Sequence, residues 1–255
     1  MELSPVLHDS RRSENAVWAS NFRQSVEYMV ELVDAGYTYI AFDAEFPGCV
    51  TSDGHGELAR FSYDNVRRSV NSSSPIQYGF SVYDAFGRRG ATFTFNLKWD
   101  RRVELFNASS IHLLENAGLS MARHAVDGID QRIFSNAISQ LFSRTDISWI
   151  CFHGAFDFGY LVKGFTGSLP NNRTEFLAEL RDLFPTRRDL KMVSTYRGGL
   201  ERLASELGVG RTGTNHEAGS DSLLTGDVFF SLLQCNGPQL YHEAVQTGHV
   251  FGLEK

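Results

Sequence analysis

Two acidic side chains interrupt an apolar segment in the first fifth of the chain. In the stretch YTYIAFDAEFPGC, Asp43 and Glu45 are one residue apart and are flanked by residues typical of a buried strand. Because successive side chains of a strand point to opposite faces, both carboxylates point to the same side. A buried carboxylate costs several kcal/mol unless it is paired or binds a metal. The pattern therefore indicates a metal site or, as the ordinary alternative, two solvated acids on an edge strand.

Two further acids and a histidine stand where secondary-structure elements are expected to begin or end. Asp157 lies in WICFHGAFDFGYL, where a strand gives way to a helix, and acids at this edge of a sheet are common in α/β active sites. His216 and Asp221 lie in NHEAGSDSLLTGDVFF. On one continuous helix they would be about 140° apart, so they converge only if His216 precedes the helix and Asp221 lies in its first turns. The structural alternatives are helix-start acids and a solvated loop histidine.

These five residues together have the chemistry that phosphodiester hydrolysis requires. Oxygen ligands suit Mg²⁺ and Mn²⁺, and two such ions about 4 Å apart can hold the attacking and leaving oxygens in line. The cations would also neutralise Asp43 and Glu45, which would explain why two acids tolerate burial. A neutral His216 beside the attacking water could take its proton. The set therefore predicts a metal-dependent hydrolase.

Apolar periodicity predicts the elements that position these residues. The expected helices cover residues 14–33, 61–70, 103–116, 127–143, 155–164, 172–184, 200–207 and 221–234, and the expected strands cover 37–46, 77–83, 91–97, 148–152 and 190–194. A polar loop is expected up to about residue 60, and the DAFGRRG turn indicates a hairpin and hence an antiparallel start to the sheet. Later strands and helices alternate. No repeat or linker divides the chain, so we expect one mixed α/β domain over residues 1–255.

Composition and charge narrow the class of protein. With 42% hydrophobic and 21% charged residues, the 255-residue chain has the composition of a folded protein with a large core. A net charge of -6 argues against a basic nucleic-acid-binding surface, although bound cations could still present positive charge to phosphates. Cys49, Cys151 and Cys235 show no zinc or disulfide spacing, which favours a reducing compartment. No signal core or apolar run of about 18 residues is found, so we expect a soluble intracellular protein.

The motifs FDAEFPG, FHGAFDFGYL and NHEAGSDSLLTGDVFF, in this order, resemble those of the DEDDh-type 3′-to-5′ exonucleases, and specifically the CCR-associated-factor poly(A) deadenylases. The resemblance continues through VWASNF, IQYGF, GID, LFP, GGL and GHVFGL, and so covers nearly the whole chain. It implies a ribonuclease H-like exonuclease fold with a mixed central β-sheet flanked by helices. It also implies a poly(A)-specific 3′-to-5′ exoribonuclease that shortens mRNA tails by two-metal-ion hydrolysis and releases 5′-AMP.

The same resemblance implies site residues and partners. Carried over residue by residue, it implies that two divalent cations, Mg²⁺ or Mn²⁺, are the cofactors. Their ligands would be Asp43, Glu45, Asp157 and Asp221, and His216 would be the general base. The implied partners are the 3′ end of poly(A) RNA and the scaffold and second-nuclease subunits of a CCR-NOT-type deadenylation complex. We expect no membrane partner and a location in cytoplasm and nucleus. The family usually has Thr where Ala44 stands, but that side chain points away from the acids, so we expect the metal site to survive.

Two substrate contacts and two competing functions complete the expectations. Phe46 is a candidate for stacking on a base and Lys191 for binding a phosphate, whereas their structural alternatives are a core ring and a solvated surface charge. One competing function is a deadenylase-fold scaffold or adaptor with little activity of its own, which the intact acids and His216 disfavour. Another is a DEDDh exonuclease for DNA or short RNA, which the resemblance along the whole chain disfavours.

Overall fold

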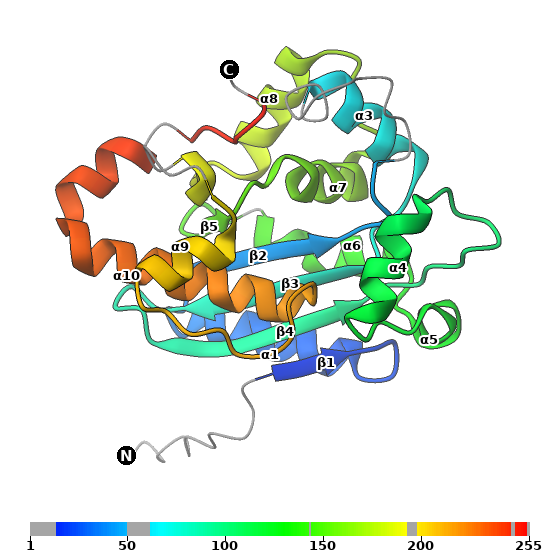
Figure 1. Ribbon diagram of the computed structural model, residues 1–255, viewed down its shortest axis with the longest axis horizontal. Coiled ribbons are helices and arrows are strands. Elements are labelled where there is room, and N and C mark those ends of the chain that lie inside the picture. The colour runs from blue at the N-terminus through cyan, green and yellow to red at the C-terminus, as the bar shows by residue number, and fades with distance from the viewer. Residues whose placement is uncertain (1–13, 50–61, 143, 193–197, 246–247, 254–255) are drawn as a thin grey trace.

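A mixed six-stranded sheet with strand order β1-β4-β3-β2-β5-β6 runs through the protein (Figure 1). The computed structural model describes residues 14–49, 62–142, 144–192, 198–245 and 248–253. The strands are β1 (Glu14–Val17), β2 (Tyr39–Glu45), β3 (Gln77–Tyr83), β4 (Arg89–Asn96), β5 (Ser148–Cys151) and β6 (Arg187–Asp189). β2, β3 and β4 are antiparallel neighbours, whereas β1, β5 and β6 join in parallel. The predicted antiparallel start and mixed sheet are confirmed.

Helices cover both faces of the sheet. One face carries α9 (Leu200–Glu206) and α10 (Ala218–Val245), and α10 crosses in front of β2 and β3 in Figure 1. The opposite face carries α1 (Phe22–Asp34), α6 (Gln131–Phe142) and α7 (Ala155–Thr166). The remaining helices are α3 (Tyr63–Ser72) and α8 (Arg173–Leu183), which pack on α7, together with α4 (Ala108–Asn116), α5 (Met121–Asp127) and the short 3₁₀ turn η1 (Leu190–Met192). Among the described residues, no helix is long and apolar enough to cross a bilayer.

The central strand β2 is covered on both faces. Ile40, Phe42 and Ala44 point into the core beneath α1, α6 and α7, whereas Ala41 points into the core beneath α9 and α10. The Phe42 ring makes edge contacts with Trp149 and Phe158, with ring centroids 5.9 and 4.8 Å apart. Such aromatic packing fixes the strand in register against its neighbours, so its C-terminal end is a rigid platform.

The N-terminal helix prediction is wrong at its start. Residues 14–17 form β1 and pair with β4, and α1 begins only at Phe22. Val17 and Trp18 fit a helical period, but an unpaired sheet edge offers residues 14–17 backbone hydrogen bonds that local periodicity cannot show. The Asn21 side chain accepts from the Trp18 N–H at 2.8 Å and so closes the turn between the two elements.

Other element boundaries also differ from the prediction, among them those of α10, which was expected over 221–234 and extends over Ala218–Val245. The helix expected from residue 103 begins at Ala108, because the Asn107 side chain caps it by accepting two backbone N–H bonds. The helix expected over 127–143 begins only at Gln131, as α6, and α5 before it was not predicted; Gly128, in an extended conformation, ends α5. The strand expected over 190–194 lies earlier, as β6, and η1 follows it. Residues 193–194 and most of the expected loop up to residue 60 lie outside the described residues.

Candidate active site

The start of α10 lies directly over the end of β2. Asp43 and Glu45 pair with Gly79 and Gln77 of β3 and lie on the sheet face that α10 covers. A Cβ atom at Gly79 would lie 1.8 Å from the carbonyl oxygen of Ala218, so only glycine permits the contact between strand and helix. This close approach brings the first turn of α10 over the two carboxylates.

The first turn of α10 positions Asp221, and the preceding loop positions His216. The Asp221 Oδ2 atom accepts a hydrogen bond of 3.0 Å from the backbone N–H of His216, which has a left-handed φ of 63°. Carboxylate and imidazole atoms of Glu45, His216 and Asp221 all lie within 4.8 Å of one another. The structure therefore brings together one acid of β2, the loop histidine and the helix acid.

Asp157 reaches the same strand end from the opposite helix layer. It lies in the first turn of α7 and is 6% exposed. Its Oδ1 atom accepts a hydrogen bond of 2.7 Å from the backbone N–H of Ala44, between the two acids of β2. The four acids named from the sequence therefore meet at the C-terminal end of β2, although they come from three separate elements.

Burial makes this group of carboxylates electrostatically unfavourable. Burial raises the pKa of Asp43 and of Glu45 well above the usual range, and the neighbouring acids raise both further. Burial likewise raises the pKa of Asp157 to about 7. It also raises the pKa of Asp221, an effect that the Arg211 guanidinium counteracts. The raised pKa values show that these carboxylates resist carrying negative charge together. A bound divalent cation would relieve this repulsion, as in sites for hard metal ions.

The donor set fits divalent cations. Four carboxylates offer the oxygen ligands that Mg²⁺ and Mn²⁺ prefer, and the His216 imidazole lies beside them. Among the described residues, Arg211 is the cation that hydrogen-bonds to these carboxylates, through Nη2 to Asp221 Oδ1 at 2.6 Å. One guanidinium cannot neutralise four acids, so the excess negative charge in a water-poor site favours cation binding.

Three supporting residues were not found from the sequence as parts of the site. Arg211 also donates to Glu201 and to the hydroxyl of Ser220, which holds the loop before α10 against the helix. Its position in a Gly-rich loop, ten residues before Asp221, gave no local signal. The other two, Gln77 and Asp189, act from within the sheet.

Gln77 and Asp189 anchor the two helices that carry Asp221 and Asp157. The Gln77 Oε1 atom accepts from the Ala218 N–H at 3.3 Å, at the start of α10. The carboxylate of Asp189 accepts four backbone N–H bonds of 2.7–3.0 Å, whose donors are His153, Gly154, Lys191 and Phe251. It therefore ties the segment before α7 to the GHVFGL segment near the C-terminus. Gln77 lies in the IQYGF motif and Phe251 in the GHVFGL motif, so family resemblance pointed to both segments, but their contacts were not predicted.

Phe46 and Lys191 already have contacts within the protein. The Phe46 ring is half-buried and stacks on Phe156, with centroids 5.0 Å apart. The Lys191 ammonium donates to the carbonyl of Gly198 and lies 5.5 Å from the Phe152 ring centroid. These contacts fix both side chains in place, and their substrate contacts stay predictions.

The chain matches a family model described as CAF1 family ribonuclease over residues 17–131 and 129–212. The chain belongs to the CAF1 ribonuclease family. It is 31% identical to CCR4-NOT transcription complex subunit 7 of Caenorhabditis elegans, over 93% of this chain and 82% of that protein. It is also 31% identical to the poly(A) ribonuclease pop2 of Schizosaccharomyces pombe, over 85% of this chain and 68% of that protein.

Solved structures of CAF1 family members match the whole fold. S. pombe Pop2p, in a form with Mg²⁺ and Mn²⁺ bound, matches with a TM-score of 0.85 and 28% identity, over 94% of this chain and 99% of that one. Yeast CAF1 co-crystallised with the NOT1 MIF4G domain matches with a TM-score of 0.79 and 26% identity, over 98% and 100%. Escherichia coli exonuclease I, at 16% identity and a TM-score of 0.56 over 80% and 42%, shares the fold alone. The predicted family and ribonuclease H-like exonuclease fold are confirmed.

Proposed function

We propose that this CAF1 family member is a metal-dependent, poly(A)-specific 3′-to-5′ exoribonuclease that releases 5′-AMP. The observation that carries the proposal is the gathering of Glu45, His216 and Asp221 within 4.8 Å of one another. Asp157 supports it, because its carboxylate accepts a hydrogen bond from the backbone of Ala44, between the two acids of β2. The assignment of adenosine tails as substrate comes from the similarity to pop2, a poly(A) ribonuclease.

In this proposal the four carboxylates hold two divalent cations, Mg²⁺ or Mn²⁺. Asp43 and Glu45 supply ligands from the rigid strand, Asp157 supplies one from α7 and Asp221 one from α10. When bound, the cations would supply Lewis-acid activation of the attacking water and of the scissile phosphate. The solved Pop2p structure with Mg²⁺ and Mn²⁺ bound supports this choice of metals.

His216 acts as the general base in the proposed reaction. Its imidazole lies beside Glu45 and Asp221, where it can accept a proton from the attacking water. Its backbone N–H donates to Asp221, so the loop that carries the base is tied to a proposed metal ligand. Phe46, the residue after β2, and Lys191 of η1 are proposed contacts with a base and a phosphate of the RNA.

We propose that the protein works as the catalytic subunit of a CCR-NOT-type deadenylation complex in cytoplasm and nucleus. The co-crystal of yeast CAF1 with the NOT1 MIF4G domain and the name of the C. elegans relative support a scaffold partner. A second-nuclease subunit is proposed on the same family grounds. The alternative of an inactive scaffold is disfavoured because all four acids and the histidine are present and meet at one strand end.

The proposal is tested with a 5′-labelled RNA that ends in about twenty adenosines, incubated with purified protein and with Mg²⁺ or Mn²⁺. We expect the labelled RNA to shorten one nucleotide at a time. Chelator, or the variant Glu45→Gln, should stop the shortening. The same RNA with a mixed-base end should shorten more slowly, and a DNA of the same sequence should persist. Early internal cuts would exclude an exonuclease, equal rates on both RNAs would exclude adenosine specificity, and an inactive parent protein would favour the scaffold alternative.

A further inference from the structure

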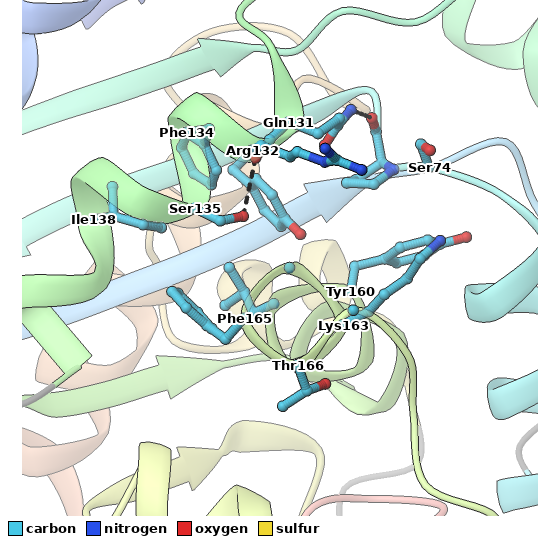
Figure 2. A pocket seen from close by; sticks show the side chains of 15 residues that line it. Ser74, Gln131, Arg132, Phe134, Ser135, Ile138, Tyr160, Lys163, Phe165 and Thr166 are labelled. Atoms are coloured by element: carbon cyan, nitrogen blue, oxygen red, sulfur yellow. Dashed lines mark hydrogen bonds between the residues drawn. The ribbon is translucent and has the colours of Figure 1, made fainter.

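A hollow of about 430 Å³ opens between α6 and α7, on the sheet face opposite the catalytic acids. Figure 2 shows Gln131, Arg132 and Ser135 of α6 on one side of the hollow and Tyr160, Lys163 and Thr166 of α7 on the other. Apolar side chains, namely Phe134, Ile138, Leu161 and Phe165, complete its walls. Its volume lies within the range of about 300–1,000 Å³ that small-molecule sites have.

A buried phenol lines this hollow without a hydrogen-bond partner among the described residues. Tyr78 of β3 is 2% exposed, and its ring stacks on Phe134 with centroids 5.1 Å apart and an angle of 12° between the planes. By contrast, the Tyr160 hydroxyl is satisfied by Ser73 at 2.8 Å. Because Tyr78 lines the hollow, its hydroxyl offers a ligand there one donor and one acceptor.

Two cations line the hollow, and no acid does. The Lys163 ammonium donates to the carbonyls of Val70 and Ser73 at 2.8 and 2.7 Å, which leaves one of its three N–H donors. The exposed Arg132 guanidinium forms no ion pair with the part of the chain that the structure describes. Burial lowers the pKa of Lys163, and the charge of Glu104 partly opposes this, but Glu104 does not line the hollow. In a chain of net charge -6, this is a local preference for an anion.

We propose that the hollow between α6 and α7 binds a free nucleoside monophosphate. The phosphate lies between Arg132 and Lys163, because a guanidinium pairs with phosphate through two parallel hydrogen bonds. The base packs on the apolar walls, and the Tyr78 hydroxyl bonds to a polar atom of the base or sugar. An inorganic phosphate would use the cations alone and would leave both the apolar walls and Tyr78 without a partner.

The site goes beyond the proposed exonuclease function and does not depend on it. Tyr78 pairs with Ala44, whose side chain points away from Asp43 and Glu45, so the sheet separates the two sites. Tyr160 and Lys163 nevertheless follow Asp157 on α7 by three and six residues. A ligand in the hollow would therefore touch the helix that carries one of the catalytic acids.

Calorimetric titration with adenosine 5′-monophosphate in the presence of chelator tests the proposal, because chelator removes metal-dependent binding at the acids. We expect saturable binding with one ligand per chain, weakened at least about tenfold in Arg132→Glu, since charge reversal opposes the phosphate. The matched control Arg181→Glu reverses an exposed charge on α8, outside the hollow, and should bind as the parent does. Tyr78→Phe keeps the stacked ring and should bind several-fold more weakly.

Three outcomes would overturn the proposal. One is the lack of saturation at millimolar nucleotide, and another is unchanged binding in Arg132→Glu. The third is equal affinity for inorganic phosphate, which would show that the apolar walls and Tyr78 take no part. Weaker binding of adenosine than of its monophosphate would support the role of the two cations.

Discussion

The Oδ1 atom of Asp157 accepts a hydrogen bond of 2.7 Å from the backbone N–H of Ala44, although 113 positions separate the two residues. Because the donor belongs to the backbone, the bond does not depend on which side chain stands at position 44. The Ala44 side chain points into the opposite core, so alanine in place of the threonine expected from family resemblance leaves this bond intact. The strand therefore fixes the α7 acid directly between the two acids of β2.

Replacing Asp157 by asparagine should remove metal binding while keeping this bond, since the amide oxygen can still accept from Ala44. Burial raises the pKa of Asp157 to about 7, so at a pH near 8 the metal-free parent holds an unfavourable buried charge. In chelator we expect Asp157→Asn to melt at the same temperature as the parent or higher. In excess metal the parent alone should gain stability, by about 2.7 kcal/mol at a metal concentration of about 100 Kd. Equal stabilisation of both proteins in thermal melts would contradict a role as metal ligand.

Substituting His216 by alanine should separate binding from chemistry. The variant keeps its backbone N–H to Asp221 and all four acids, so we expect metal to raise its melting temperature as in the parent. Without the base, single-turnover cleavage of adenosine-tailed RNA should fall about 10²–10⁴-fold. The rates are measured at saturating metal over the pH range in which imidazole titrates. A variant within a few-fold of the parent, with the same pH profile, would make His216 a loop residue only.

The sequence predicted the acids of β2 because the evidence is local: alternation along a strand places Asp43 and Glu45 on one face whatever the rest of the fold does. His216 and Asp221 could be related because a short Gly-rich loop leads into a helix with an apolar stripe. Most interior elements were found for the same reason, with β3 at the expected residues 77–83. The resemblance to family motifs then indicated that these distant segments come together, which periodicity alone cannot show.

Features that depend on distant partners were not predictable from local patterns. β1 exists because the edge of β4 accepts it, and its residues look helical in isolation. Arg211 acts through charge on Asp221, and Asp189 through four backbone donors that come from three segments. In each case the sequence shows an ordinary polar residue, and only tertiary packing gives it a role.

Adding a methyl group at Gly79 should destabilise the protein and inactivate it together. In Gly79→Ala the new Cβ would lie 1.8 Å from the Ala218 carbonyl oxygen and 2.1 Å from its carbon, so α10 has to move away from β3. We expect a loss of about 1–3 kcal/mol or more in urea unfolding, and a fall in cleavage because His216 and Asp221 move with the helix. Gly210→Ala is the matched control, since its Cβ meets nothing within 4 Å. Parent-like activity in Gly79→Ala would show that the contact is not needed.

Converting Asp189 to asparagine should loosen the start of α7. The Oδ2 atom accepts the backbone N–H groups of Gly154 and Phe251, and an amide NH₂ in its place would oppose both donors. Each unsatisfied buried donor costs about 1–3 kcal/mol, so we expect a lower unfolding free energy and faster amide exchange at the start of α7 and in residues 248–253. The exposed substitution Asp182→Asn should change neither measurement. Unaltered exchange in Asp189→Asn would refute the anchoring role.

The buried histidine His124 should make stability fall on acidification. Its Nδ1 atom lies 2.9 Å from the Leu97 carbonyl, to which it donates, and the side chain is 1% exposed. Burial, together with the charge of Arg123, lowers the pKa of His124 below its ordinary value of 6.5. The folded protein therefore binds fewer protons than the unfolded chain below about pH 6.5, and acid favours unfolding.

The variant His124→Asn tests this dependence, because the amide can still donate to Leu97 but does not titrate. At pH near 7.5 the variant should be less stable than the parent, since the smaller side chain loses the ring contact with Trp18. As the pH is lowered from 6.5, the parent should lose its advantage by at most about 1.4 kcal/mol per pH unit. Urea unfolding of both proteins between pH 7.5 and 5 measures the difference. If the difference in unfolding free energy stays constant with pH, the neutral, buried state of His124 does not contribute to stability.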